Sequence, residues 1–291
     1  MRKIGIYVLS NPNYTLSECI QITSQVGFDY IATSIHHINS ENKTDFLLAT
    51  ERAGLEIDNV HLSGSGMNNI WLQGDLGEQI IERAKKEMDI SLSAGIKKGV
   101  LHVTWGYDEV PVTEIGIERF SRIVEYAEKI GYIIGFENSV SAQHLKKVLD
   151  AFQYSPSAMF TFDTGHWSAF CPQETIYEDY AQRIAITHLA DNDGARDLHL
   201  IPFDGCIDYK KLAPSLSRLD RLTFEVGGVN RTIQSTAPIT EEHQYLCATG
   251  VYKQGLVHFY DNYFTLYENL SYEGYLQRIL ESAKKLDKML G

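Results

Sequence analysis

Four side chains of the types that bind metal ions each follow a short apolar run. They are Glu137, Asp163, His188 and Glu225. Consecutive members are separated by enough residues for one strand, one helix and their loops, so in a parallel barrel all four would lie at the same rim. Three carboxylates and an imidazole gathered there repel one another strongly unless a cation lies among them, which predicts a divalent metal site. An acidic residue that ends a strand can instead cap the following helix.

Further polar side chains occupy comparable positions. They are His61, His102, His166, Asp197 and His199. His61 and His102 lie at the ends of two earlier apolar runs, and the other three follow the runs that carry the predicted metal ligands. Such groups can bind metal or hydrogen-bond the hydroxyls of a substrate, and a lone buried histidine can equally belong to the core.

Three tryptophans lie near the same predicted rim. Trp71, Trp105 and Trp167 could stack on the apolar face of a sugar, or they could be core residues. Lysines and arginines form no cluster near these positions, so the sequence does not predict a binding site for a phosphorylated substrate.

A regular alternation of strands and helices would bring these residues together. Apolar runs predict eight strands near residues 3–8, 30–35, 57–62, 98–103, 133–137, 159–163, 184–189 and 221–226. Helical patterns separate them, and several of these patterns end at a glycine that suits the left-handed position after a helix, namely Gly27, Gly54, Gly95 and Gly131. Eight such units predict an α/β fold, a (βα)8 TIM barrel that forms a single domain over residues 1–291.

One segment departs from this rhythm. About residues 227–271 separate the eighth strand from a last helix that begins near Tyr272. The segment is rich in aromatic residues, and so we expect it to be ordered and to form a lid over the rim or an interface in a homo-oligomer. Its aromatics are Tyr245, Tyr252, Phe259, Tyr260, Tyr263, Phe264 and Tyr267.

Composition narrows the classes of protein. The 291 residues carry a net charge of −12, which disfavours a general surface for nucleic acid. No run is long enough to span a membrane, and the first residues predict a strand and no signal peptide. Four scattered cysteines without a C-x-x-C pair predict reduced thiols in a cytoplasmic protein. The absence of a G-x-G-x-x-G motif or a P-loop disfavours nucleotide binding.

Four motifs at the strand ends resemble those of the xylose-isomerase-like superfamily. They are Gly135-Phe136-Glu137-Asn138, Phe162-Asp163-Thr164-Gly165-His166, Thr187-His188-Leu189-Ala190-Asp191-Asn192-Asp193 and Phe224-Glu225. The superfamily contains sugar isomerases and epimerases, inosose dehydratase and zinc-dependent apurinic-site endonucleases. The resemblance extends from the first strand to Glu225 and does not cover the aromatic insertion. The sequence Val103-Thr104-Trp105 after His102 and the loop at 201–208 depart from the usual glycine-containing turns.

The resemblance implies specific roles. Glu137, Asp163, His188 and Glu225 would hold one divalent ion, which could be manganese, cobalt, magnesium or zinc. Glu137 and Glu225 would also remove and return a proton beside a carbonyl, through a metal-stabilised enediolate. The substrate would be a small sugar or polyol. Its predicted contacts are His61, His102, His166, Trp105, Trp167, Asp197 and His199.

Other members of the superfamily define the alternatives. In the endonucleases the equivalents of His61, His102, His166, Asp197 and His199 complete a trinuclear zinc cluster, so a multi-zinc phosphodiesterase is the second hypothesis. A related dehydratase and a barrel that keeps the metal site without catalysis are further ones. Because the chain is acidic, we expect an isomerase or epimerase with no nucleic-acid or membrane partner.

Overall fold

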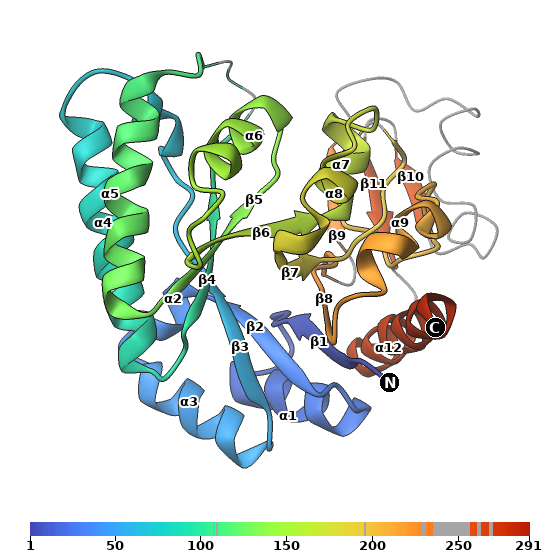
Figure 1. Cartoon of the computed structure of the whole chain (residues 1–291). Helices are drawn as coiled ribbons and strands as arrows, with labels where there is room; N and C mark the ends of the chain where they lie inside the picture. The colour runs from blue at the N-terminus through green and yellow to red at the C-terminus, as the bar shows by residue number, and fades with distance from the viewer. Residues whose placement is uncertain are drawn as a thin grey trace.

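An eight-stranded parallel sheet forms the centre of the computed structural model (Figure 1). The strands lie in the order β7-β6-β5-β4-β3-β2-β1-β8. They are β1 (Lys3–Tyr7), β2 (Tyr30–Ser34), β3 (Glu56–His61), β4 (Lys98–His102), β5 (Ile133–Glu137), β6 (Ala158–Asp163), β7 (Ile184–His188) and β8 (Arg221–Phe224). A bridge between Leu189 and Phe224 joins the two ends of the sheet. The predicted (βα)8 barrel is therefore confirmed.

The structure describes residues 1–106, 108, 110–194, 196–228, 231–234, 257–260, 263–267 and 270–291. Within these ranges the helices alternate with the barrel strands. The α-helices are α1 (Leu16–Val26), α2 (Ile35–Ile38), α3 (Lys43–Arg52), α4 (Asp75–Ser93), α5 (Glu114–Ile130), α6 (Ala142–Ala151), α7 (Thr164–Phe170), α8 (Ile176–Asp179), α9 (Tyr209–Leu216) and α12 (Tyr272–Leu290). Two 3-10 helices, η1 (Met67–Trp71) and η2 (Ala181–Arg183), lie in the connections.

Local sequence signals account for the helix ends. Thr15 and Glu18 form a capping box at the start of α1, with each side chain bonded to the other's backbone N–H. Gly27 and Gly131 follow α1 and α5 with φ of 109° and 68°, in the left-handed region that favours glycine. These signals set where each helix stops, and hence the lengths of the loops that lead into the strands.

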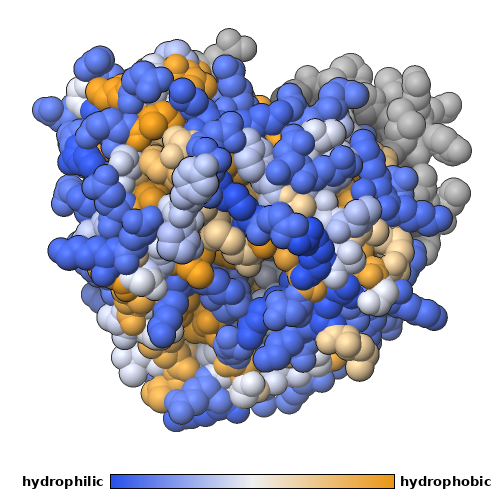
Figure 2. Space-filling view, in the orientation of Figure 1, coloured by the Kyte–Doolittle hydropathy of each residue, from blue (hydrophilic) through white to orange (hydrophobic). Residues whose placement is uncertain are grey.

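The core lies within the barrel and between the barrel and its helices. The strands are buried on both faces, and each long helix buries one stripe, as α12 does with Leu276, Ile279 and Leu286. On the face shown in Figure 2, hydrophilic side chains predominate and hydrophobic ones occur in small groups between them. Among the described residues no helix has the length and apolar character needed to cross a membrane.

Part of the aromatic segment lies outside the described residues. The predictions for Tyr245 and Tyr252, and for the segment's role as a lid or interface, concern residues outside the described ranges. The described part contains the antiparallel strands β9 (Arg231–Gln234), β10 (Val257–Tyr260) and β11 (Tyr263–Leu266), in the order β10-β11-β9. Tyr267 is buried, and its hydroxyl group lies 3.0 Å from the Asp204 carboxylate.

Candidate metal centre

The barrel register brings the predicted ligands to one rim. Asp163 and His188 are direct partners across β6 and β7, and His102 and Glu137 are direct partners across β4 and β5. Glu225 follows β8, and its backbone N–H donates to Leu189 across the closure of the barrel. Because all these strands are parallel, their carboxyl ends open on the same side.

Three groups of potential ligands result from this arrangement. In each group, one ligand atom from every member lies within 4.8 Å of the others. The central group contains all four predicted metal ligands, Glu137, Asp163, His188 and Glu225. The other two groups are His61 with His102 and Glu137, and His166 with Asp197 and His199. We call these the central, first flanking and second flanking groups.

His188 is the meeting point of the central group. Its Nδ1 lies 2.6 Å from Glu137 Oε1 and 2.8 Å from Glu225 Oε2. Glu137 and His188 are both completely buried, and Glu225 is partly exposed. Two carboxylates therefore converge on a single imidazole nitrogen, which has one position to donate a proton or bind a metal.

Asp163 divides its two carboxylate oxygens between two roles. Oδ1 accepts the backbone N–H of His166 at 2.6 Å and so caps α7. Oδ2 is buried and has no hydrogen-bond partner among the described residues. Oδ1 therefore caps a helix, as the alternative interpretation of the sequence predicts. Oδ2 lacks a hydrogen-bond partner among the described residues, and a bound ion or ligand would stabilise it.

Burial and the neighbouring histidines act in opposite directions on the carboxylates. Burial raises the pKa of Glu137, but His188 and His102 outweigh it and hold that pKa well below its ordinary value. For Glu225 the effect of burial is again outweighed by His188, and the pKa is lowered to about 2. For Asp163 burial prevails over the attraction of His166, and the pKa is raised to about 6. The histidines thus favour the ionised form of the two glutamates, whereas burial disfavours the ionised form of Asp163.

The first flanking group uses the second oxygen of Glu137. Glu137 Oε2 lies 2.8 Å from His102 Nε2 and 3.3 Å from His61 Nε2, and the two histidine nitrogens are 3.1 Å apart. The other nitrogen of His61, Nδ1, lies 2.8 Å from the Leu62 carbonyl oxygen, which can only accept. The proton of a neutral His61 is therefore on Nδ1, and its Nε2 presents a lone pair to the group.

The second flanking group has the same construction. His166 Nε2 lies 3.4 Å and His199 Nε2 3.1 Å from Asp197 Oδ2. Backbone carbonyls of Asn138 and Glu225 accept from Nδ1 of the two rings, at 2.9 Å in each case. Both Nε2 atoms thus face Asp197, an arrangement that needs either a protonated ring or a shared cation.

These distances fit a divalent cation. Ligand atoms about 2.0 to 2.1 Å from a tetrahedral zinc ion lie roughly 3.3 Å apart, close to the separations within the flanking groups. The histidine tautomers set by backbone carbonyls are those that second-shell partners impose on metal ligands. The residues present therefore fit a metal ion, and the donor set of nitrogen and carboxylate oxygen suits manganese, cobalt or zinc.

A buried carboxylate shapes the loop that supplies the second flanking group. Asp191 accepts the backbone N–H groups of Asn192, Phe203 and Ile207 at 2.9 Å each. A side chain at Gly205 would collide with Asp191 and with the Asn192 carbonyl. Asp191 thus holds the two ends of this loop together through backbone N–H groups, although residues 201–208 lack one glycine of the turn that is usual in the superfamily.

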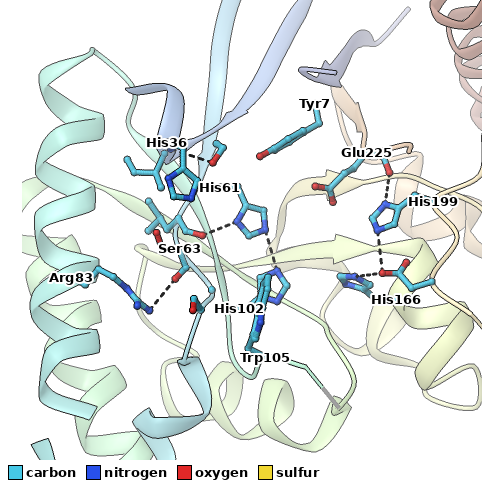
Figure 3. A pocket seen from close by; sticks show the side chains of 16 residues that line it. Tyr7, His36, His61, Ser63, Arg83, His102, Trp105, His166, His199 and Glu225 are labelled. Atoms are coloured by element: carbon cyan, nitrogen blue, oxygen red, sulfur yellow. Dashed lines mark hydrogen bonds and ion pairs between the residues drawn. The ribbon is translucent and has the colours of Figure 1, made fainter. Parts of the chain in front are cut away.

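A cavity of about 540 Å³ opens above these groups (Figure 3). Seven of the predicted site residues line it: His61, His102, Trp105, His166, Asp197, His199 and Glu225. Glu137, Asp163 and His188 lie beneath the surface of the cavity, where all three are completely buried.

The structure separates the three tryptophans. Trp105 lines the cavity and is 47% exposed. Trp71 is completely buried and donates through Nε1 to the Val103 carbonyl oxygen. Trp167 is buried too, and its Nε1 donates to the carbonyl oxygen of Glu174. Among the three, Trp105 alone lines this cavity.

Sequence reasoning missed several residues of the cavity wall. Tyr7, His36 and Arg83 line it, as do residues 63–65 of the loop after β3. Tyr7 and Ser34 are the last residues of β1 and β2, so the rule that found the other strand ends could have found them. Arg83 lies in the middle of α4, where no local signal marks it.

The fold and the site define a class: a (βα)8 barrel with a candidate metal centre at the carboxyl ends of its strands. The chain belongs to the xylose isomerase-like TIM barrel family, whose model matches residues 20–248. A curated relative is the uncharacterised protein y4fM of Sinorhizobium fredii, 28% identical over 150 residues. The match covers 47% of this chain and 48% of that protein, so the chain spans about half the length of the relative.

Solved structures share the fold over nearly the whole chain. D-psicose 3-epimerase with D-tagatose from Clostridium cellulolyticum H10 has a TM-score of 0.70 at 12% identity and covers 99% of both chains. D-allulose 3-epimerase from Methylomonas sp. has a TM-score of 0.67 at 15% identity, with 98% of both chains covered. A xylose isomerase domain protein from Alicyclobacillus acidocaldarius has 0.67 at 15%, with 99% covered. At these identities the likeness shows the fold alone.

Proposed function

We propose that this protein is a divalent-metal-dependent isomerase or epimerase that acts on a small sugar or polyol. The observation that carries the proposal is the convergence of Glu137, Asp163, His188 and Glu225 directly beneath a cavity of about 540 Å³. That volume lies in the range of sites that enclose small ligands. The names of the structural neighbours, which include D-psicose and D-allulose 3-epimerases, support the same chemistry.

The central group would hold the ion. When bound, a divalent cation supplies the positive charge that stabilises an oxyanion formed as a carbon-bound proton leaves. Asp163 Oδ2 is buried without a hydrogen-bond partner among the described residues, and His188 Nδ1 lies between the two glutamates. Metal analysis of the purified protein would identify the ion as manganese, cobalt, magnesium or zinc.

The two glutamates differ in their access to a substrate. Glu225 lines the cavity, whereas Glu137 is completely buried and contacts His61, His102 and His188. We propose proton-transfer roles for both, and the access of Glu225 to the cavity supports its taking a proton directly from a sugar carbon. Glu137 has the additional role of linking the central and first flanking groups.

The walls of the cavity suit a polyhydroxylated molecule. His166, Asp197 and His199 offer polar atoms on one side, and the exposed Trp105 ring can stack on the apolar face of a sugar. We therefore assign substrate contacts to His61, His102, His166, Asp197, His199 and Trp105. Trp167, predicted from the sequence as a contact, would act through the packing beneath the rim.

The test is solvent exchange at carbon. Metal-loaded protein would be incubated in heavy water with D-fructose, D-tagatose, D-allulose and inososes, and deuterium in the recovered sugar measured by mass spectrometry. We expect incorporation at the carbon next to the carbonyl together with an isomer or epimer. Loss of water from an inosose would indicate the dehydratase reaction instead, and no reaction with any compound of the panel would contradict the proposal.

The two flanking groups favour a second candidate, a multi-zinc phosphodiesterase that cleaves DNA at abasic sites. Together the three groups offer ligands for more than one cation. The net charge of −12 and a cavity wall with Arg83 as its single arginine or lysine among the described lining residues disfavour a DNA duplex. Metal analysis and a cleavage assay on an abasic oligonucleotide at low salt separate the two candidates. Three tightly held zinc ions together with strand cleavage would establish the phosphodiesterase.

The free cysteines support a proposal about the compartment in which the protein works. Cys19, Cys171 and Cys206 are free, and Cys206 is exposed. Unpaired thiols persist in a reducing compartment, so we propose a cytoplasmic protein that works without a nucleic-acid or membrane partner. We also propose that the chain forms a single domain. We propose that it assembles as a homo-oligomer, and light scattering measures the mass of that assembly.

A further inference from the structure

Arg83 is a positive charge on the wall of the cavity, and the described residues give it no carboxylate partner. It belongs to α4, is partly buried, and lines the cavity that also exposes Glu225. Its one hydrogen bond among the described residues runs from the guanidinium to the Ser63 carbonyl oxygen at 3.2 Å. A guanidinium carries five N–H donors, so most of them are left for another acceptor.

The surroundings of Arg83 are fixed before any ligand arrives. Glu87, one helical turn further on, accepts the backbone N–H and the hydroxyl of Ser63 at 2.9 and 2.5 Å. Its carboxylate is thereby used to hold the loop and makes no ion pair with Arg83 among the described residues. The Ser63 carbonyl in turn orients the guanidinium. The result is a preorganised cation, whose side-chain entropy is already partly lost.

Trp105, which also lines the cavity, is held in place by residues near Ser63. Asn68 bonds the backbone N–H and the carbonyl oxygen of Trp105, at 2.8 Å each. A side chain at Gly64 would collide with the Trp105 ring. Arg83 and Trp105 are therefore attached to one rigid loop, on either side of Ser63 and Gly64, and both line the cavity.

Figure 3 shows where this cation lies relative to the candidate metal centre. Arg83, His36 and Ser63 are on one side of the cavity, whereas Glu225, His199 and His166 are on the opposite side, with His61 and His102 between them. A molecule whose reacting carbon lies against Glu225 would extend past His61 toward Arg83. The atoms that reach Arg83 would belong to the end of the substrate remote from the reaction.

We propose that Arg83 binds an anionic group, phosphate or carboxylate, at the far end of the substrate, so that the preferred substrate is an anionic sugar. This inference rests on the proposed isomerase or epimerase function. A planar guanidinium matches the paired oxygens of both anions, and His36 and Ser65 are further polar residues of the lining. A neutral sugar would leave the cation without an acceptor of opposite charge.

The test compares sugars that differ in this group alone. Deuterium exchange by the metal-loaded protein would be measured with D-fructose, D-fructose 6-phosphate and D-fructuronate. We expect kcat/KM to be roughly 10- to 100-fold higher for one of the anionic sugars than for D-fructose, the range expected of charged hydrogen bonds. The anion that gives the higher value identifies the source of the charge.

Variants assign the preference to this side chain. Arg83→Gln should reduce the ratio of kcat/KM for the anionic sugar to that for D-fructose by roughly 10-fold or more, chiefly through KM. Arg83→Lys keeps the charge and should restore part of the ratio. Arg52→Gln, on α3 outside this cavity, should leave the ratio unchanged. A ratio that stays the same in Arg83→Gln, or a preference for D-fructose, would overturn the proposal.

A binding measurement separates this inference from the proposed function. If no sugar exchanges deuterium, the isomerase or epimerase proposal fails, and calorimetric titration of the metal-loaded protein with D-fructose 6-phosphate then tests Arg83 by itself. Affinity that falls roughly 10-fold in Arg83→Gln and recovers in Arg83→Lys supports the anion site. Equal affinity in the native protein and both variants overturns it.

Discussion

The two ends of the barrel differ in how their charged side chains are paired, and strands β3, β4 and β8 contribute such side chains to both ends. β4 and β8 begin with Lys98 and Arg221, and Asp58 is the third residue of β3. There the buried Asp58 carboxylate lies 2.7 Å from Lys98 Nζ and 3.0 Å from Arg221. At the other end the same strands lead to His61, His102 and Glu225, which belong to groups of imidazole nitrogens and carboxylate oxygens that lie within 4.8 Å of one another.

This difference distinguishes structural charges from binding charges. At the amino end each buried charge has a partner supplied by the protein itself, so the cluster needs nothing from outside. At the carboxyl end Asp163 Oδ2 and Asp197 Oδ1 are buried without a hydrogen-bond partner among the described residues. Those groups are stabilised when an ion or substrate supplies the missing charge. Stability and function are thus placed at opposite ends of the same strands.

Removing the metal should have the largest effect. Chelation is expected to reduce solvent exchange at carbon by roughly 10³-fold or more, because a cation contributes several kcal/mol to stabilising the developing negative charge. Adding back manganese, cobalt, magnesium or zinc should restore it. Steady-state rates before and after chelation, with metal content measured in parallel, provide the check. Full activity in protein stripped of metal would remove the metal from the reaction.

Replacing Glu225 should separate proton transfer from metal binding. In Glu225→Gln we expect deuterium exchange to slow by roughly 10²- to 10⁴-fold in protein that still holds the ion, since a positioned acid or base contributes about that factor. Glu56→Gln, which alters a partly exposed carboxylate at the amino end, is the matched control and should keep its activity. Normal exchange in a metal-loaded Glu225→Gln protein would exclude a catalytic role for this side chain.

At the amino end the expected effect is on stability. Asp58→Asn leaves Lys98 and Arg221 without their shared carboxylate, and we expect the free energy of unfolding to fall by about 1 to 3 kcal/mol. The lower part of that range reflects the partial exposure of both cations, 24% and 26%. Urea unfolding measures the loss. Because the cluster is far along the strands from the rim, metal content and kcat should not change, and a loss of metal would contradict the division between the two ends.

Trp105 should show the smallest effect. Its ring is 47% exposed and the bonds from Asn68 are to the backbone of residue 105, so Trp105→Ala should keep the loop in place and lower the urea midpoint only modestly. The loss of stacking on a sugar should raise KM by roughly 3- to 10-fold, in line with about 0.5 to 1.5 kcal/mol for an aromatic contact. Tyr154→Ala, at a site that is 92% exposed and outside this cavity, is the control. An unchanged KM would show that Trp105 does not contact substrate.

Much of the candidate site could be predicted from short stretches of sequence. An apolar run that ends in Glu137, Asp163 or His188 is a local pattern, and the alternation with capped helices shows that all such runs point the same way. The four residues of the central group were therefore found together. The same reasoning found His61 and His102 as strand ends. Their shared contact with Glu137 Oε2 depends on the neighbouring positions of β3, β4 and β5 in the closed sheet.

Other features could not be predicted from short stretches of sequence. Trp71, Trp105 and Trp167 all follow strands, yet their exposures differ because η1 and α7 carry two of them back into the core. Arg83 lies in the interior of α4, and its place on the cavity wall depends on how that helix packs beside the loop after β3. A helical pattern predicts which face is buried, but it does not predict which polar residue at the edge of that face meets a cavity.

The sequence by itself determined the barrel, the order of its strands and the four residues of the central group, because periodicity, helix caps and strand ends are short-range properties of the chain. The tertiary structure decided which of these residues lie close enough to share an ion, which tautomer backbone carbonyls favour in His61, His166 and His199, and that Arg83 faces the candidate metal centre across one cavity. Those features depend on backbone carbonyls and side chains that are distant in sequence, and they come within a few ångströms only when the strands pair and, for Glu225 and His188, when the sheet closes between β7 and β8.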